Sequence, residues 1–391
     1  MIYGWPEKDE DKKLLFEEIR NFSAKEIAPK AAHYDETGEF PKPIIDQMGE
    51  MGLMGMVVSE KYGGSGLDTV SYAMAMEAVS AGCASSGVIM SVNNSLVCAP
   101  IERWAPEDLK KKVLPELASG KKIGCFALSE PGHGSDPAGL KCSAKKVEGG
   151  YEVNGSKNWI TSGKEADYCV LFATTDAAKK HKGIIALCVE TSSKGFSVSK
   201  VEKKLGIKAS STAQLFFDKV FVPDENVIAP EGEGFKVAMH TLDGGRIGIA
   251  AQALGISQCA YDASVRFASE REQFGAPIIQ LQAVQFHIAN MATRLQSARL
   301  LTWLAAKTKD EGLSYTKEAA MAKLAASEAS NFITDKAIQV HGGYGYTKEY
   351  VPERNFRDAR ITEIYEGTSE IQRIVIAASI IKEFQDSQGN A

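Results

Sequence analysis

The segment richest in residues that could do chemistry runs from Arg357 to Arg373. Within it, Ser369 and Gln372 have the spacing of a capping box, which predicts a helix that begins near Glu370 and a loop just before it. Glu366, beside an aromatic residue and a glycine, would then lie in that loop. A carboxylate on a loop at the start of a helix is suited to act as a general base on a ligand in the adjoining cleft.

Four further segments could bind polar parts of a ligand. Each combines glycines or a proline turn with hydroxyl, amide, aromatic or guanidinium side chains. They are Phe126–Asp136, Trp159–Ser162, Arg271–Pro277 with Gln282 following, and Gln339–Gly345. A plain structural interpretation exists for each, namely a surface turn, a core tryptophan, a helix-end salt bridge and a helix C-cap. At this point both interpretations stay open.

The elements that must position these residues follow the order helices, strands, helices. Apolar residues recur at three- and four-residue steps from Asp9 to about Gly120, with one helix expected from Pro41 through Met51. Strand-like runs follow between about Ile123 and Val222, with hairpin turns expected at 149–150 and 154–155. After Gly234 the helical period returns and predicts long helices near 235–270, 280–308, 315–341 and 369–384.

This pattern predicts an α+β fold in three parts. We expect an N-terminal helical domain over 1–120, a central β-barrel-like domain over 121–232 and a C-terminal four-helix bundle over 233–391. A ligand site is expected where these layers meet, because clefts form at domain interfaces.

Composition and missing motifs exclude several classes of function. The 391 residues carry 45 basic and 50 acidic side chains with no basic block, which disfavours nucleic-acid binding. The longest uncharged stretch, Ala78 to Ile101, contains serines, asparagines, glycines and a proline, which predicts a buried helix and turn and no membrane span. The chain lacks the glycine-rich nucleotide motifs, GxSxG and HExxH, so Rossmann, P-loop, hydrolase and zinc-protease chemistry are disfavoured.

The cysteines and the N-terminal residues bear on the compartment. Seven scattered cysteines with no CxxC spacing indicate neither a disulfide framework nor a metal site, and they fit a reducing compartment. The first residues include no apolar signal core and no Arg-rich presequence, so either no targeting is needed or a presequence has been removed.

The five segments, in this order and with this layout, resemble the acyl-CoA dehydrogenase family, most closely its short-chain (butyryl-CoA) members. The likeness extends from the first helix to Ile381. It implies an FAD enzyme that removes one hydrogen from each of Cα and Cβ of a short-chain acyl-CoA in fatty acid β-oxidation, giving the trans-2-enoyl-CoA. Its electrons would pass to electron-transferring flavoprotein.

The resemblance also implies roles for single residues. Glu366 would be the catalytic base, and its backbone N–H would bind the thioester oxygen. The residues implied around the flavin and ribityl chain are Phe126, Leu128, Ser129, Ser135, Trp159, Ile160, Thr161, Thr368 and Glu370. Those implied at the pyrophosphate and adenosine, partly from a neighbouring subunit of a homotetramer, are Arg271, Phe274, Gln282, Gln339, Gly342 and Gly343. Those implied at the substrate are Ser135, Asp243, Arg246, Tyr365 and Gly367. No metal is implied.

Two positions bear on the subgroup and the acyl length. Family members related to isovaleryl-CoA and long-chain dehydrogenases have their base where this chain has Gly245, so Glu366 alone can serve here. We interpret the Gly244–Gly245 pair as a close approach of backbone to CoA. The segment Val88–Leu96 resembles the acyl-pocket wall of short-chain members, which implies four- to six-carbon straight substrates.

Alternatives to this interpretation remain. Short branched acyl groups are compatible with the same motifs. A flavin oxidase or monooxygenase of the same architecture, or a non-catalytic scaffold that kept the fold, are further hypotheses. The mitochondrial matrix is the expected compartment, with a bacterial cytoplasm as the alternative.

Overall fold

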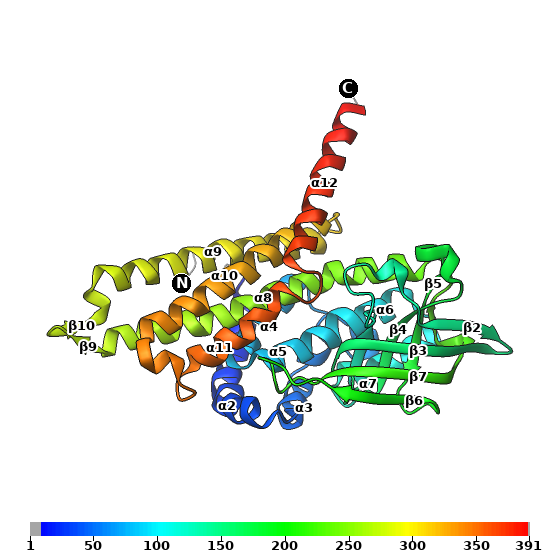
Figure 1. Ribbon diagram of the computed structural model, residues 1–391, viewed down its shortest axis with the longest axis horizontal. Helices are drawn as coiled ribbons and strands as arrows, with labels where there is room; N and C mark the ends of the chain where they lie inside the picture. Colours follow the sequence, from blue (N-terminus) through cyan, green and yellow to red (C-terminus); the bar gives the residue numbers. More distant parts are fainter. Residues whose placement is uncertain (1–8, 390–391) are drawn as a thin grey trace.

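The computed structural model describes residues 9–389 of the chain. Helices form the first part, a β-sheet the middle and long helices the last part (Figure 1). This order of elements is the one expected from the hydrophobic period. Helices give way to strands between Ala118 and Gly124, and strands to helices between Ala229 and Gly234. The domain boundaries themselves stay predictions.

The N-terminal part is a set of helices around a buried apolar core. The predicted helix over 41–51 corresponds to α3. The helices are α1 (Glu10–Phe22), α2 (Ala28–Thr37), α3 (Lys42–Glu50), α4 (Thr69–Gly82), α5 (Ala84–Ser91), α6 (Ala99–Trp104) and α7 (Glu107–Ala118), with π-helical segments at Ser23–Ile27 and Val92–Cys98. The stretch from 78 to 101 is buried almost throughout and breaks at Cys83, between α4 and α5, as a buried helix and turn would. Among residues 9–389, no helix combines the length and apolarity needed to cross a bilayer.

The central part is one sheet with two halves that share a core. Its strands are β1 (Gly124–Ala127), β2 (Ser143–Val147), β3 (Gly150–Thr161), β4 (Tyr168–Thr174), β5 (Ile184–Glu190), β6 (Phe196–Val201), β7 (Thr212–Pro223) and β8 (Val227–Ala229). They pair in the order β6-β7-β3-β2-β4-β5-β8, with β1 parallel to β4. Strands β2 and β4 meet at a single pair, Ser143 with Thr174, and apolar residues from both halves form one buried cluster. The sheet therefore folds on itself, as a barrel-like domain does.

One of the two expected hairpin turns is wrong. The turn before Gly150 connects β2 to β3 as expected. Asn154 and Gly155 lie inside β3 instead, at a β-bulge where the register with β7 shifts. There Gly155 has φ of +144°, and Asn154 Oδ1 accepts the backbone N–H of Lys219 at 2.9 Å. The Asn-Gly pair thus serves a bulge, which needs the same backbone freedom as a turn.

Long helices form the C-terminal part. They are α8 (Gly234–Glu270), α9 (Gln282–Asp310), α10 (Thr316–His341), α11 (Val351–Ala359) and α12 (Ser369–Gly389), and a small hairpin, β9 (Glu272–Gln273) with β10 (Ala276–Pro277), joins α8 to α9. Helix α4 packs against α8 and α9, so the N-terminal part completes the bundle. Helix α12 runs beside α10, where Lys317 pairs with Glu383 at 2.6 Å, and its end projects beyond the bundle (Figure 1).

Candidate active site

The loop that carries Glu366 is a tight left-handed turn. It follows α11 and a 3-10 turn over Arg360–Glu363, and it ends where α12 begins. Glu366 and Gly367 have φ of +51° and +91°. This conformation is easy for glycine but costs an ordinary residue about 1–2 kcal/mol, so other contacts must hold Glu366 in place.

Two buried side chains hold this turn through its carbonyl oxygens. Lys323 Nζ, from α10, donates to the Gly367 carbonyl at 2.8 Å. Gln372 Nε2, from α12, donates to the same oxygen at 2.8 Å and to the Glu366 carbonyl at 3.2 Å. Both side chains are fully buried. The left-handed turn is therefore fixed by two different helices.

The Glu366 carboxyl group lies against α8 at Gly245. A Cβ atom at position 245 would overlap Glu366 Oε2 and would lie 2.8 Å from Leu96 Cδ2. Glu366 Oε2 is buried and has no hydrogen-bond partner within the described chain. The missing side chain of Gly245 makes room for the carboxyl group, and the expected approach of CoA to the Gly244–Gly245 pair stays a prediction.

Burial sets the acidity of this carboxyl group. Removal from water raises the pKa of Glu366 to about 7, while the cationic side chains of Lys323 and Arg246 oppose the rise. A carboxylate with a pKa near neutrality is a stronger base than a surface glutamate and is still ionised in much of the population at neutral pH. An unpartnered oxygen of this kind is suited to take a proton from a weakly acidic carbon.

The side of α8 that contacts the Glu366 carboxyl group at Gly245 also carries Gly248 and Gln252. Gly245, Gly248 and Gln252 are three and seven residues apart, so they lie on one side of the helix over about 10 Å. A Cβ atom at Gly248 would lie 2.5 Å from Ser91 Oγ and 2.7 Å from the Tyr72 hydroxyl. This face therefore faces hydroxyl groups from α4 and α5.

Tyr365 and Gln252 join at the far end of this face. Tyr365 donates its hydroxyl proton to Gln252 Oε1, and Gln252 Nε2 donates to the Ala84 carbonyl at 2.8 Å. Burial raises the pKa of Tyr365, so its hydroxyl stays protonated. The side chain of Gln252 thus ties the Glu366 loop to α5.

Asp243 and Arg246 form a buried pair beside Glu366. Arg246 Nη1 donates to Asp243 Oδ1 at 2.6 Å, and Thr316 Oγ1, from α10, donates to Asp243 Oδ2 at 2.6 Å. Arg246 Nε is buried without a partner within the described chain. The structure brings this pair to the Glu366 site, and a role in substrate binding stays a prediction.

The segment from Phe126 follows β1 and is fixed to β3. The Ser129 carbonyl accepts the backbone N–H of Asn158 at 2.9 Å. Buried Lys157 donates to the Leu128 carbonyl and to Glu130 Oε1, both at 2.9 Å. Leu128 is buried, Phe126 and Ser129 are partly exposed and Ser135 is exposed in the turn that follows.

Trp159 lies at a second bulge of β3, between Lys157 and Ile160. It has φ of +64°, and 60% of its side chain is exposed. The core-tryptophan interpretation is therefore wrong. Ile160 next to it is buried and Thr161 is partly exposed. An exposed indole on a bulge, near the Phe126 segment, is a flat apolar surface that a planar ligand could cover.

A second group of predicted residues lies at the opposite end of the bundle, around β9 and β10 (Figure 1). Phe274 is 93% exposed with φ of +55°, and the Arg271 guanidinium lies 5.6 Å from the centre of the Tyr344 ring. The remaining members, Gln282, Gln339, Gly342 and Gly343, are also exposed. A single chain does not bring these residues to Glu366.

The start of α12 corrects the predicted capping box. Thr368 is the residue before the helix, and its Oγ1 accepts the Ile371 N–H at 3.4 Å. The Ser369 hydroxyl is buried without a partner in the described residues, and the Gln372 side chain points back to the Glu366 loop. The helix begins about where it was expected, but the cap is Thr368 and the loop takes the glutamine. Glu370 is exposed on the first turn.

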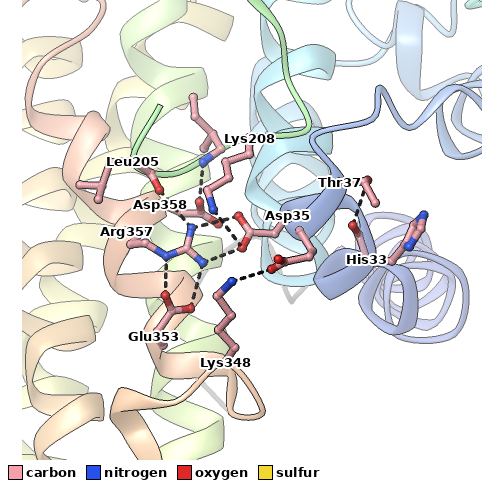
Figure 2. Close-up of polar contacts among 11 residues, drawn as sticks. His33, Asp35, Thr37, Leu205, Lys208, Lys348, Glu353, Arg357 and Asp358 are labelled. Carbon is pink, nitrogen blue, oxygen red and sulfur yellow. Dashed lines mark hydrogen bonds and ion pairs between the residues drawn. The ribbon is translucent and has the colours of Figure 1, made fainter. Parts of the chain in front are cut away.

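A polar network fixes the helix that leads into this loop (Figure 2). Arg357, on α11, donates from Nη2 to Asp35 on α2 at 2.6 Å and from Nε to Glu353 at 2.6 Å. Asp358 Oδ1 accepts the Ile207 N–H at 2.5 Å from the connection between β6 and β7. All three parts of the chain therefore meet on the helix that precedes the Glu366 loop.

Sequence reasoning missed three residues of this site. They are Lys323, Gln252 and Gly248. A signal existed for Lys323, because it lies four residues after Ala319 and three before Ala326 on the buried face of its helix. The two residues on α8 gave no such signal, since the whole helix is apolar or small around them.

The chain matches three family models in succession. They are the N-terminal domain of acyl-CoA dehydrogenase over residues 9–121, the middle domain over 125–220 and the C-terminal domain over 232–381. This fold and site define a member of a dehydrogenase family with three such domains. The chain belongs to the acyl-CoA dehydrogenase family.

Individual relatives sharpen this assignment. The short-chain specific acyl-CoA dehydrogenase of Bos taurus mitochondria is 50% identical over 98% of this chain and 93% of its own length. The short-chain specific acyl-CoA dehydrogenase of Clostridium acetobutylicum is 47% identical over 95% and 98%.

Solved structures agree in fold. Butyryl-CoA dehydrogenase of Megasphaera elsdenii has a TM-score of 0.94 at 40% identity, over 97% of this chain and all of that one. A glutaryl-CoA dehydrogenase from Mycobacterium smegmatis, in complex with FADH2, has a TM-score of 0.90 at 31% identity, over 95% of each chain. The expected fold class is confirmed.

Proposed function

We propose that this protein is a short-chain acyl-CoA dehydrogenase, which converts short-chain acyl-CoA thioesters to trans-2-enoyl-CoA in fatty acid β-oxidation. The observation that carries the proposal is the Glu366 carboxyl group, buried, unpartnered and with its pKa raised to about 7. The full-length identity with short-chain specific relatives supports the same assignment.

Glu366 would remove the proton from Cα of the thioester. Its carboxylate becomes a carboxylic acid, and negative charge develops on the thioester oxygen. By family resemblance, the Glu366 backbone N–H donates to that oxygen, and a fixed donor at that place stabilises the charge. Lys323 and Gln372 hold the Gly367 carbonyl and so keep the carboxyl group and this N–H in one orientation.

FAD, when bound, supplies the acceptor for the hydride that leaves Cβ. The residues present fit such a group. The exposed Trp159 indole would cover the ring system, and Thr161 on the same strand and Ser129, whose carbonyl accepts the Asn158 N–H, offer hydroxyl groups near it. Thr368 would contact the flavin by resemblance. Ser135, Asp243, Arg246 and Gly367 would contact the CoA part of the substrate.

A second copy of the chain would complete the cofactor site. The distal residues Arg271, Phe274 and Gln339 are exposed, and the β9–β10 hairpin, which includes Phe274 in its turn, lies at the opposite end of the bundle from the start of α12 (Figure 1). A guanidinium group suits a pyrophosphate, and it could reach one bound beside Trp159 only from a neighbouring subunit. We therefore propose an oligomer, a homotetramer by resemblance.

The segment Val88–Leu96, which resembles the acyl-pocket wall of short-chain members, and the full-length identity with short-chain specific relatives support short straight acyl substrates. Ser91 of this segment packs against α8 at Gly248, where an added Cβ would lie 2.5 Å from its Oγ, so the segment lies beside the helix that also contacts Glu366.

Electron-transferring flavoprotein is the proposed electron acceptor, by the same resemblance. The named relatives include a mitochondrial protein and a clostridial one at similar identity. We propose the mitochondrial matrix as the compartment, with the bacterial cytoplasm as the alternative. Cell fractionation of the source organism decides between them.

The test is a visible absorption spectrum of the purified protein during anaerobic addition of acyl-CoA. We expect a yellow protein that is bleached by butyryl-CoA and hardly by octanoyl-CoA. Bleaching by isobutyryl-CoA alone would move the specificity to branched groups. Rapid peroxide formation in air would favour an oxidase, and a colourless protein unable to take up FAD would contradict the proposal.

A further inference from the structure

Lys323 is a buried lysine that approaches the active-site loop from α10. Its side chain has no exposed surface, and its Nζ donates to the Gly367 carbonyl at 2.8 Å. A lysine is rarely buried without a carboxylate partner, because the ammonium group loses its hydration. Lys323 forms no ion pair within residues 9–389, so its position needs another explanation.

The charges around Glu366 are not equivalent. Arg246 is the other cation close to it, and that guanidinium is already paired with Asp243 at 2.6 Å. Glu363 on the 3-10 turn is paired with Arg360. The ammonium of Lys323 is therefore the cation whose field on Glu366 is least cancelled.

Besides Arg246, which also acts on the Glu366 carboxyl group, Lys309 of α9 lies nearby, with its Nζ 3.6 Å from where a Cβ of Gly244 would stand. Tyr72 on α4 and Tyr365 on the loop itself are neutral phenols with raised pKa values. Glu370, on α12, is exposed and lies near Arg373. Burial lowers the pKa of Lys323 to about 8, and the Glu366 carboxylate opposes this fall, just as Lys323 opposes the rise in the pKa of Glu366 that burial causes.

We propose that Lys323 is a positioning residue for the base: its ammonium anchors the left-handed Glu366–Gly367 turn and keeps the buried Glu366 carboxylate ionised before substrate binds. This inference rests on the proposed function, in which Glu366 is the base. It assigns to Lys323 two separable effects, a hydrogen bond and an electric field. The first sets the orientation of the carboxyl group and the second sets its protonation.

The field has a defined consequence for pH dependence. Burial raises the pKa of Glu366 to about 7, and Lys323 limits that rise. Removal of the ammonium should move the acid limb of log kcat/KM against pH to higher pH. A move of about one unit corresponds to about a tenfold loss of kcat/KM below the limb and to little loss well above it.

The experiment compares pH profiles of the FAD-loaded enzyme with butyryl-CoA. Lys323→Met removes the charge and the donor, Lys323→Gln removes the charge and keeps an N–H donor, and Lys323→Arg keeps the charge. Lys336→Met is the matched control on the same helix, since Lys336 pairs with Asp335 at 2.9 Å. We expect the acid limb of log kcat/KM to move to higher pH in Lys323→Met and Lys323→Gln. It should stay at the wild-type pH in Lys323→Arg and in Lys336→Met.

Each outcome has a definite meaning. An unchanged acid limb in Lys323→Gln, with activity lost equally at every pH, would leave Lys323 as a structural anchor and overturn the electrostatic part. If Lys323→Met does not retain FAD, the Gln and Arg pair decides the question. If Glu366→Gln keeps full activity, the proposed function itself fails. An inactive Glu366→Gln with an unshifted Lys323→Gln profile contradicts this inference alone.

Discussion

The two ends of the helical bundle are built in opposite ways. Around Glu366, buried side chains from α8, α10 and α12 fix one loop, and Glu366 Oε2 has no hydrogen-bond partner among the described residues. Around Arg271 and Phe274, the side chains are exposed, and the Arg271 guanidinium lies over the ring of Tyr344. The residues that position the Glu366 carboxyl group all come from this chain, whereas the distal residues lie on an exposed surface that we propose binds the cofactor of a neighbouring subunit.

The largest expected effect is at the buried end. Glu366→Gln removes the base and keeps the shape, so kcat with butyryl-CoA should fall about 10³-fold with FAD retained. Steady-state turnover with an artificial electron acceptor measures it, and the flavin absorbance per chain is the control. If Glu366→Gln turned over butyryl-CoA at the wild-type rate, the buried end of the bundle would not be the one that carries the base.

Gly245→Ala tests the fit of the carboxyl group against α8. The added Cβ overlaps Glu366 Oε2, so the carboxyl group must move, and kcat should fall about 10- to 100-fold. Gly244→Ala is the comparison, because the atom nearest to the added Cβ would be Lys309 Nζ at 3.6 Å. The loss of kcat in Gly244→Ala should therefore be smaller than in Gly245→Ala. Equal losses in the two variants would show that the overlap is not the cause.

A substitution at the exposed end should weaken FAD binding and leave the proton transfer to Glu366 unchanged. Arg271→Ala should weaken FAD binding about tenfold, since one charge-assisted contact is lost, with kcat preserved at saturating FAD. Fluorescence titration of the apoprotein with FAD measures the Kd. A tenfold lower kcat at unchanged FAD affinity would contradict the division between the two ends.

The smallest effect is on stability, and its sign depends on pH. The pKa of Glu366 is raised from 4.5 to about 7 in the fold, so the folded state binds more protons than the unfolded state between these values. Stability therefore decreases as pH rises through this window. Glu366→Gln should melt roughly 2–4 °C above the parent at about pH 8, and at the same temperature below pH 4.5. An equal difference at both pH values would argue against a buried, ionising carboxyl group.

The sequence predicted the elements better than the contacts between them. Helical period placed α8, α9 and α10 within a few residues, because each has a long buried face. The Asn154–Gly155 pair led to a wrong prediction of a hairpin turn, because a bulge inside β3 requires the same residue types as such a turn. Helix α11 was not predicted as a separate element, although it leads, through the 3-10 turn over Arg360–Glu363, into the Glu366 loop.

In the site, too, local features could be predicted from the sequence, whereas contacts between distant residues could not. Glu366 could be found from its neighbours in the chain, because a loop before a helix cap is a local signal. Gly245 and Lys323 lie 121 and 43 residues before it, and nothing local links them to the base. That link depends on how α8 and α10 pack, which periodicity does not specify.

The central claim is that the Glu366 carboxylate takes the proton from Cα. The most direct measurement is anaerobic rapid mixing of the yellow enzyme with butyryl-CoA, unlabelled or deuterated at Cα, with flavin absorbance as the signal. The wild type should bleach with a slower rate for the deuterated substrate, and Glu366→Gln should bind butyryl-CoA yet stay yellow. Bleaching of Glu366→Gln at the wild-type rate, with the same isotope effect, would mean that another group removes the proton.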